Sequence, residues 1–159
     1  MAQFALITKW HVEAPQAAVW EAIYDTDRWP EWWPYVMSVE ELGPGDAQGV
    51  GVLRRLTWKT RLPYTLSFLV RSTRVERPHA LEGKASGELE GMGLWRLSSE
   101  GAVTVVQYDW TVDVTKPWMV WLAPLAKPLF KWNHDAVMRA GGEGLAKRLG
   151  AKLLRFERG

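Results

Sequence analysis

The chain has 159 residues, enough for one domain with a substantial core, and we treat residues 1–159 as a single domain. Its 20 Lys and Arg against 18 Asp and Glu leave a net charge of +2, so we expect no nucleic-acid partner. The absence of cysteine excludes disulfides and thiolate metal sites and fits the reducing cytoplasm, where we expect the protein to be located.

The first part of the chain predicts a strand, a short helix and an aromatic loop. We expect no signal peptide, because residues 1–12 lack its pattern. Residues 4–12 alternate as a half-buried strand does, with one face made by Phe4, Leu6, Thr8, Trp10 and Val12. Pro15 marks a helix start, and apolar residues recur at helical spacing through Tyr24. Residues 25–35 hold two prolines among three tryptophans, which allows at most one helical turn.

The middle of the chain predicts six strands joined by short links, which is typical of an antiparallel meander. Their ranges are 36–42, 50–60, 64–76, 80–90, 93–99 and 103–115. The last strand has the clearest alternation, and its predicted inward face consists of Thr104, Val106, Tyr108, Trp110, Val112 and Val114.

The end of the chain changes to a helical pattern. A proline-interrupted apolar entry at 117–128 precedes one long helix at about 129–154. The apolar stretch 118–130 is shorter than the roughly 20 residues that span a bilayer, so we expect no transmembrane segment and a soluble protein. We interpret the basic tail as a solvated helix face, with weak attraction to anionic lipid left open; it comprises Lys147, Arg148, Lys152, Arg155 and Arg158.

This order predicts an α+β fold. A curved antiparallel sheet of about seven strands wraps around a long C-terminal helix, and two short helices follow the first strand. One face of such a sheet is apolar and needs the helix as its cover.

Local motifs accompany this order. They are Trp10-His11-Val12 with Ala14-Pro15 and Val19-Trp20, Asp27-Arg28-Trp29-Pro30 with Trp32-Trp33-Pro34, and Gly49-Val50-Gly51. With these motifs the chain resembles the START-like or SRPBCC superfamily of Bet v 1-type helix-grip proteins, and within it the polyketide cyclase/dehydrase and lipid-transport group. The resemblance implies a deep apolar cavity between sheet and helix. It leaves the function open, because such proteins include lipid binders, cyclases and chaperone activators.

The eleven tryptophans and the small residues of strand 80–90 also fit a cavity. The inward face of that strand carries Leu81, Gly83, Ala85, Gly87 and Leu89, which leaves room for a ligand. Alternatively, its glycines let the sheet bend or the helix approach. The predicted inward aromatic residues would stack on a flat ligand or pack densely in the core; they are Trp10, Trp58, Trp95, Tyr108 and Trp110.

One side of the final helix is predicted to face the sheet, and it carries Phe130, His134, Val137, Met138, Gly141 and Leu145. His134 is therefore a candidate acid/base or hydrogen-bonding group inside the cavity. We favour the alternative that it bonds to a tryptophan N–H, a tyrosine hydroxyl or a strand carbonyl. His11 and His79 fall on an outward face and in a turn, so we expect no metal site and no cofactor.

Arg54 has two interpretations. Strict alternation places it inward, where it would bind an acidic group of a ligand. We favour a bulge at Arg54-Arg55 that sends one of them outside, because an unpaired buried charge is expensive.

The aromatic loop is expected to place some of Trp29, Trp32 and Trp33 at the cavity mouth. With Trp118, Trp121 and Leu122 they would form an apolar rim for a membrane or a partner protein. The favoured alternative to this rim is a self-packed lid.

Three functions follow. The first is binding of a hydrophobic small molecule, with ligand-contacting residues Trp10, Arg54, Trp58, Trp95, Tyr108, Trp110, Phe130, His134 and Met138. The second is a cyclase, dehydratase or aromatase with His134 as acid/base and Tyr108 or Arg54 polarising a carbonyl, although no inward carboxylate orients the histidine. The third is a protein-interaction module that uses the Trp-rich loops and the basic tail. We rank the binder first.

Overall fold

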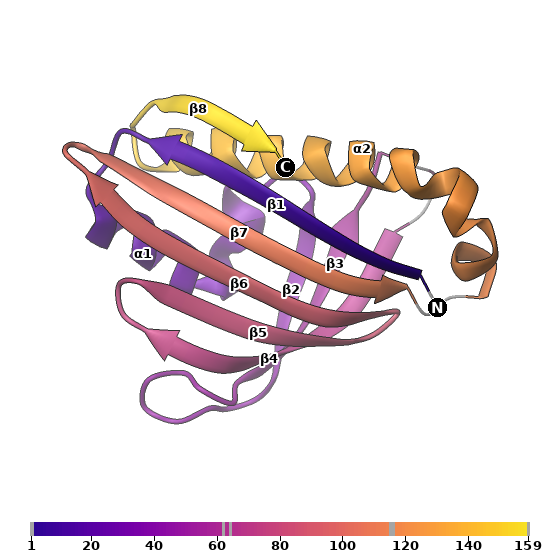
Figure 1. Ribbon diagram of the computed structural model, residues 1–159. Coiled ribbons are helices and arrows are strands. Elements are labelled where there is room, and N and C mark those ends of the chain that lie inside the picture. The colour runs from indigo at the N-terminus through magenta and orange to yellow at the C-terminus, as the bar shows by residue number, and fades with distance from the viewer. Residues whose placement is uncertain (1, 62, 64, 115–116, 159) are drawn as a thin grey trace.

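A computed structural model, which describes residues 2–61, 63, 65–114 and 117–158, has one antiparallel sheet curved around a long helix (Figure 1). In chain order the elements are β1 Ala2–Val12, α1 Gln16–Tyr24, η1 Thr26–Glu31, β2 Val36–Gly43, β3 Leu53–Lys59, β4 Thr65–Glu76, β5 Ala80–Gly87, β6 Leu89–Glu100, β7 Val103–Val114, α2 Pro117–Arg148 and β8 Leu153–Arg158. The sheet order within the described residues is β2-β3-β4-β5-β6-β7-β1-β8. The predicted α+β fold is confirmed, with eight strands instead of about seven.

The alternation predicted for β1 is found in the structure, where β1 lies between β7 and β8. Phe4, Leu6, Thr8, Trp10 and Val12 are all buried on the concave face. The strand pairs with β7 on one side and β8 on the other, so that Trp10 lies between Val106 and Phe156. The first and last parts of the chain are thereby joined in one sheet.

Two predicted strand boundaries were wrong, and local turn structure explains both. The turn between β5 and β6 lies at Glu88 and not at Gly91-Met92. Gly87 makes this turn possible, because its φ of 106° is a backbone conformation that residues with a side chain rarely adopt. β3 begins at Leu53 and not at Val50, because Asp46 Oδ1 accepts hydrogen bonds from the backbone N–H groups of Gln48 and Val50 and orders the preceding loop.

The C-terminal prediction also needs correction, because α2 ends at Arg148 and the chain returns as β8. Gly150 has a φ of 62°, and the Ala151 N–H donates to the carbonyl of Ala146 at 2.8 Å, as in a glycine-terminated helix. The basic tail is therefore not one helix face: Lys147 and Arg148 end α2, while Arg155 and Arg158 belong to β8.

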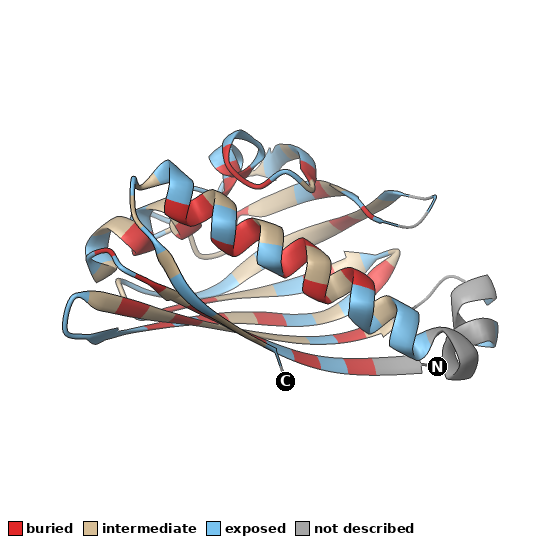
Figure 2. Ribbon diagram, turned by 90° about the horizontal axis from the view of Figure 1, so that it is seen from above, coloured by how far each residue is buried: buried red, intermediate tan, exposed pale blue. Residues whose placement is uncertain are grey.

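The buried side of α2 faces the sheet (Figure 2). Its glycines allow close packing: a Cβ on Gly141 would lie 2.4 Å from the Trp33 ring, and one on Gly142 would lie 2.9 Å from the Trp10 ring. Trp33 Nε1 donates to the carbonyl of Val137 at 2.8 Å, and Trp10 Nε1 donates to that of Met138 at 3.0 Å. Trp10 therefore holds α2 against β1, and Trp33 holds it against the segment before β2.

The helix begins at Pro117, upstream of the predicted start at about Leu129. The side chains of Trp118 and Leu122, expected to form part of an apolar rim, lie outside the described residues. Among the described residues, no helix combines the length and the apolarity that crossing a bilayer requires.

Candidate functional site

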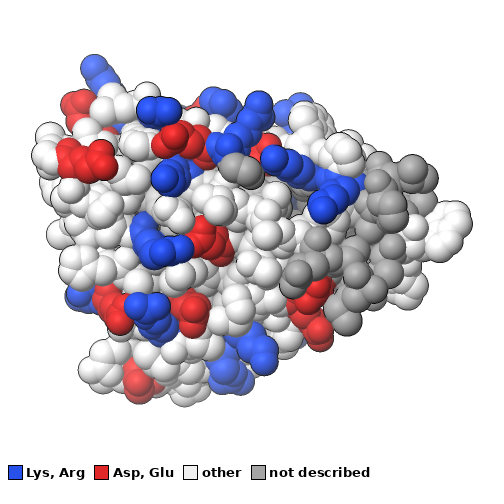
Figure 3. All heavy atoms as spheres, viewed as in Figure 1, with Lys and Arg blue, Asp and Glu red and all other residues white. Residues whose placement is uncertain are grey.

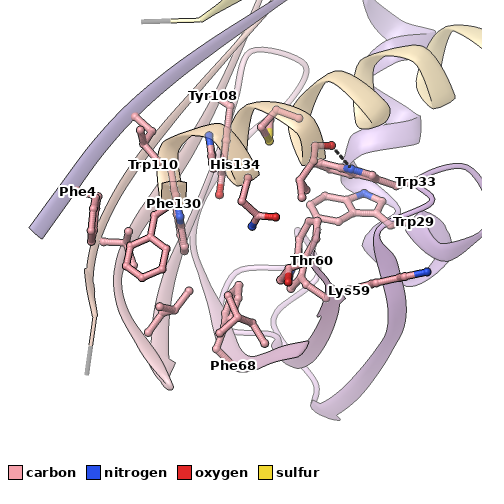
Figure 4. A pocket seen from close by; sticks show the side chains of 18 of the residues that line it. Phe4, Trp29, Trp33, Lys59, Thr60, Phe68, Tyr108, Trp110, Phe130 and His134 are labelled. Atoms are coloured by element: carbon pink, nitrogen blue, oxygen red, sulfur yellow. Dashed lines mark hydrogen bonds between the residues drawn. The ribbon is translucent and has the colours of Figure 1, made fainter. Parts of the chain in front are cut away.

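A cavity of about 140 Å³ lies between the concave face of the sheet, η1 and α2 (Figure 4). Its lining is mainly aromatic and aliphatic and comes from strands, loops and helix together: Phe4, Leu6, Trp29, Trp33, Trp58, Lys59, Thr60, Leu66, Phe68, Leu89, Trp95, Tyr108, Trp110, Val112, Phe130, Asn133, His134, Val137 and Met138. The small residues of β5 predicted to leave room do not line this cavity.

The sheet wall of the cavity is a run of packed rings. Trp95 on β6 stacks on Tyr108 of β7 with ring centroids 4.1 Å apart, and Tyr108 stacks on Trp110 at 6.0 Å. Trp110 also stacks on Phe68 of β4 at 5.9 Å. Because neighbouring rings restrict one another, this wall offers a rigid, flat apolar surface.

The aromatic segment before β2 closes one side of the cavity. Trp29, Trp32 and Trp33 are all buried. They do not form an exposed rim, and the structure has the self-packed lid that we favoured. Trp29 Nε1 donates to the carbonyl of Ile23 at 3.0 Å, which anchors the segment to α1. Trp29 and Trp33 line the cavity, although the predicted set of ligand-contacting residues did not include them, because a proline-rich loop has no periodicity that shows which side chains point inward.

His134 lies on the cavity side of α2. Both ring nitrogens are buried, and within the described part of the chain neither has a hydrogen-bond partner. The hydrogen bond to a tryptophan, tyrosine or strand carbonyl that we favoured is therefore not found there. Burial lowers the pKa of His134 from 6.5 to about 4, so the imidazole is neutral at pH 7.

Tyr108 is the second titratable group of the lining. Burial raises the pKa of its hydroxyl, which keeps it protonated at physiological pH. A Cβ on Gly93 would lie 2.6 Å from this hydroxyl oxygen, so the absence of a side chain at Gly93 leaves the hydroxyl its space. The tyrosine is thus held as a neutral hydrogen-bonding group on the sheet wall.

Arg54 lies on the concave side of β3, and the favoured bulge at Arg54-Arg55 was wrong. The β3–β4 register runs without a shift, and the irregularities of the β2–β3 pair lie in β2. Arg54 Nε donates to Asp27 Oδ1 at 2.9 Å, which supplies the charge partner that the sequence argument lacked. It lines a second hollow of about 70 Å³ and not the main cavity.

The structure brings together seven of the nine predicted ligand-contacting residues: Trp58, Trp95, Tyr108, Trp110, Phe130, His134 and Met138. Trp10 is instead 1% exposed in the core and does not line the cavity. Trp58 lines both hollows, and its Nε1 is buried without a hydrogen-bond partner among the residues described.

The polar part of the lining consists of Lys59, Thr60 and Asn133 at one edge, together with Tyr108 and His134. Asn133 Oδ1 accepts a hydrogen bond from the Arg61 N–H at 2.8 Å and so ties the β3–β4 connection to α2. Lys59 is exposed and points away from the cavity in Figure 4. Sequence reasoning missed Asn133, because its contact is 72 residues away in the chain.

Comparisons with known proteins agree on the fold. A protein of the START superfamily from Mycobacterium smegmatis superposes with a TM-score of 0.75 at 14% identity, covering 92% of this chain and 98% of that chain. The protein TTHA0849 from Thermus thermophilus gives 0.74 at 17% identity, covering 91% and 99%. The Zhui aromatase/cyclase from Streptomyces sp. R1128 gives 0.68 at 16%, covering 93% and 96%. No curated protein sequence matches the chain.

The sequence match is more specific than these structural similarities. The profile of the family described as "Polyketide cyclase / dehydrase and lipid transport" matches residues 5–150, nearly the whole chain. The helix-grip arrangement and the solved START and aromatase/cyclase structures agree with that match. The chain therefore belongs to the polyketide cyclase/dehydrase and lipid transport family of the START-like superfamily.

Proposed function

We propose that the protein binds a small, partly aromatic hydrophobic molecule with one hydrogen-bonding group in the cavity between the sheet and α2. The observation that carries this proposal is the imidazole of His134, which has no partner among the described residues and lies in a cavity walled by stacked rings. A buried polar group without a partner costs about 1–3 kcal/mol, and a ligand hydroxyl or carbonyl would remove that cost. Trp58 Nε1 is a second buried donor without a partner in the described part of the chain.

The cavity volume limits the size of the ligand. At about 140 Å³ the cavity is close to engineered protein cavities of roughly 150 Å³ that hold a benzene ring. One or two fused rings therefore fit, whereas a long acyl chain or a polycycle would need the rings between the two hollows to move.

Calorimetric titration with naphthalene and 2-naphthol tests this proposal. Because the hydroxyl of 2-naphthol pairs with His134, we expect it to bind at least fivefold more tightly than naphthalene, and His134→Leu to remove that preference. Val112→Phe, which fills the cavity from β7, should weaken both probes at least tenfold. The control Val105→Phe lies on the outer face of the same strand and should change neither affinity.

Absence of binding, or equal affinities in wild type and Val112→Phe, would refute the proposal. Native mass spectrometry of the purified protein detects a ligand bound in the cell, because a small molecule in the cavity adds a discrete mass to the protein. Extraction of that molecule then identifies it.

A second candidate function is dehydration of a β-hydroxy ketone, which the presence of Tyr108 and His134 in the same cavity favours. The Tyr108 hydroxyl would donate to the carbonyl while His134 takes the α-proton; the C–O bond then breaks and the hydroxyl leaves as water with the proton from the imidazolium. A base with a pKa of about 4 is poorly matched to pH 7, and none of the described lining residues is a carboxylate. We therefore rank binding above catalysis.

The enzymatic candidate has a simple assay. 4-Hydroxy-4-phenylbutan-2-one loses water to a conjugated enone that absorbs in the near ultraviolet. Turnover that disappears in a folded His134→Ala variant would establish catalysis, and no turnover above the buffer rate would leave the binding function.

A further inference from the structure

The first half of α2 carries an exposed aromatic and basic surface. Trp121 is 80% exposed, Trp132 46% and Leu129 45%, unlike the tryptophans of the core. Lys127 and Lys131 are exposed on the same stretch, and the Arg61 guanidinium stacks 4.8 Å from the centroid of the Trp132 ring. We call this set the α2 patch: Arg61, Trp121, Lys127, Leu129, Lys131 and Trp132.

The α2 patch faces away from the core. Pro128 and Trp132, four residues apart, are exposed on the side of the helix opposite Phe130 and His134, which line the cavity, and Trp121 is exposed nearer the start of α2. Figure 2 shows exposed residues where α2 meets its grey segment. The second half of α2 differs, because Arg139 stacks on Phe156 at 4.6 Å and Asp135 pairs with Arg158 at 3.7 Å.

Among the described residues, these contacts of β8 with α2 lie at Asp135 and Arg139, beyond the C-terminal end of the α2 patch. An exposed pair of indoles beside lysines is unusual on a surface that contacts water alone, because large apolar side chains there gain nothing from burial.

The charge of the α2 patch indicates which kind of partner binds there. No Asp or Glu occurs between Asp113 and Asp135, nor between Asp46 and Glu76, the two segments that carry the α2 patch. Elsewhere acidic and basic side chains mix, and Figure 3 shows basic side chains at the upper border of the grey segment and acidic ones at its lower border. Tryptophan and lysine together match a bilayer interface, where indoles insert at headgroup level and cations meet anionic lipids.

We propose that the α2 patch docks the protein on an anionic lipid bilayer. The patch lies beside the cavity, because two of its members contact lining residues. Lys127 Nζ is 5.9 Å from the centroid of the Phe4 ring, and the Arg61 backbone N–H donates to Asn133 Oδ1. A docked molecule therefore presents this end of the cavity to the lipid surface. Membrane docking stands apart from the ligand proposal, because it needs the patch alone.

Sedimentation with vesicles tests docking. Wild-type protein should co-sediment with vesicles of phosphatidylcholine containing 30% phosphatidylglycerol and bind pure phosphatidylcholine at least tenfold more weakly. Trp121→Ala/Trp132→Ala and Lys127→Glu/Lys131→Glu should each reduce binding to the anionic vesicles at least tenfold. High salt should reduce wild-type binding, because the basic part of the attraction is screened.

Matched controls separate docking from general effects. Met37→Ala/Leu154→Ala removes exposed apolar side chains elsewhere, and Lys147→Glu/Lys152→Glu makes the same charge change at the other end of α2; both should bind like wild type. Circular dichroism checks that each variant folds.

Three results would overturn the proposal. They are no preference of the wild type for anionic vesicles, unchanged binding of the patch variants, and a wild-type dimer in light scattering that Trp121→Ala/Trp132→Ala dissociates. The last result would assign the patch to a second copy of the chain.

Discussion

His134 is buried, neutral and without a hydrogen-bond partner among the described residues. Its position follows from helical spacing, because Phe130, His134, Val137 and Met138 share the side of α2 that faces the sheet. The low pKa follows from desolvation, which penalises the imidazolium. This combination favours a hydrogen bond to a neutral ligand over an ion pair with a charged one.

The stability of the protein should depend on pH through His134. The folded state binds a proton there below about pH 4 and the unfolded state below its ordinary 6.5, so the unfolded state holds more protons between these values. Acidification through this window should lower the free energy of unfolding by roughly 3 kcal/mol. Urea unfolding at several pH values measures it, and His134→Leu should lose this dependence without losing stability at pH 7.

Asp135 provides the control for this experiment. Burial raises the pKa of its carboxyl, so its contribution has the opposite sign: the folded state keeps the proton to higher pH than the unfolded state does. Asp135→Asn should therefore retain the acid destabilisation. An identical pH profile in wild type and His134→Leu would contradict the assignment to His134.

The close packing of α2 against its neighbours requires two glycines as well as apolar contacts. Gly141 and Gly142 admit the rings of Trp33 and Trp10, whose indole N–H groups then reach helix carbonyls. Asn133 ties the β3–β4 connection to the same helix. The helix is therefore held at both ends of the cavity by specific contacts with distant segments.

Gly141→Ala should destabilise the protein although alanine is the better helix former. The new Cβ would lie 2.4 Å from the Trp33 ring, which is 1% exposed, and a shift of this ring would break its hydrogen bond to the Val137 carbonyl. We expect a loss of about 1–3 kcal/mol in the free energy of unfolding. Gly43→Ala, where the nearest described atom lies at 3.9 Å, is the control and should change stability little. A more stable Gly141→Ala would mean that Trp33 can yield.

Asn133→Ala should loosen the connection between β3 and β4. The Arg61 N–H loses its acceptor at 2.8 Å, and we expect faster hydrogen exchange at Arg61 with a loss of about 1 kcal/mol. Asn133→Asp keeps an oxygen acceptor and should preserve the protection. If the Arg61 amide exchanges equally fast in all three proteins, the bond does not hold the connection.

In the whole molecule, the cavity and the C-terminal strand β8 are separate. The cavity is built from β1, β3, β4, β6, β7, α2 and the segment before β2, and no described residue of β8 lines it. β8 instead pairs with β1 and contacts α2 through Phe156 and Arg158. The last strand therefore stabilises the packing of the sheet against α2 without lining the cavity.

Truncation after Ala151 should separate stability from binding. Loss of β8 exposes the edge of β1 and removes the contacts of Phe156 and Arg158 with α2, so the melting temperature should fall. The affinity for 2-naphthol, measured by calorimetry at a temperature where the truncated chain is folded, should stay within about twofold of wild type. Phe156→Ala should show the same separation in milder form, and a tenfold loss of affinity in either protein would contradict it.

The sequence by itself determined the order of elements from β1 to α2, the inward face of β7 and the cavity side of α2, because periodicity reports which face of a strand or helix is apolar. Tertiary structure decided the rest. Arg54 was judged too costly inside because its partner Asp27 lies on another element, 27 residues away. The burial of Trp29, Trp32 and Trp33, the return of the chain as β8 and the exposure of Trp121 depend on which distant segments cover which faces, and no local pattern records that.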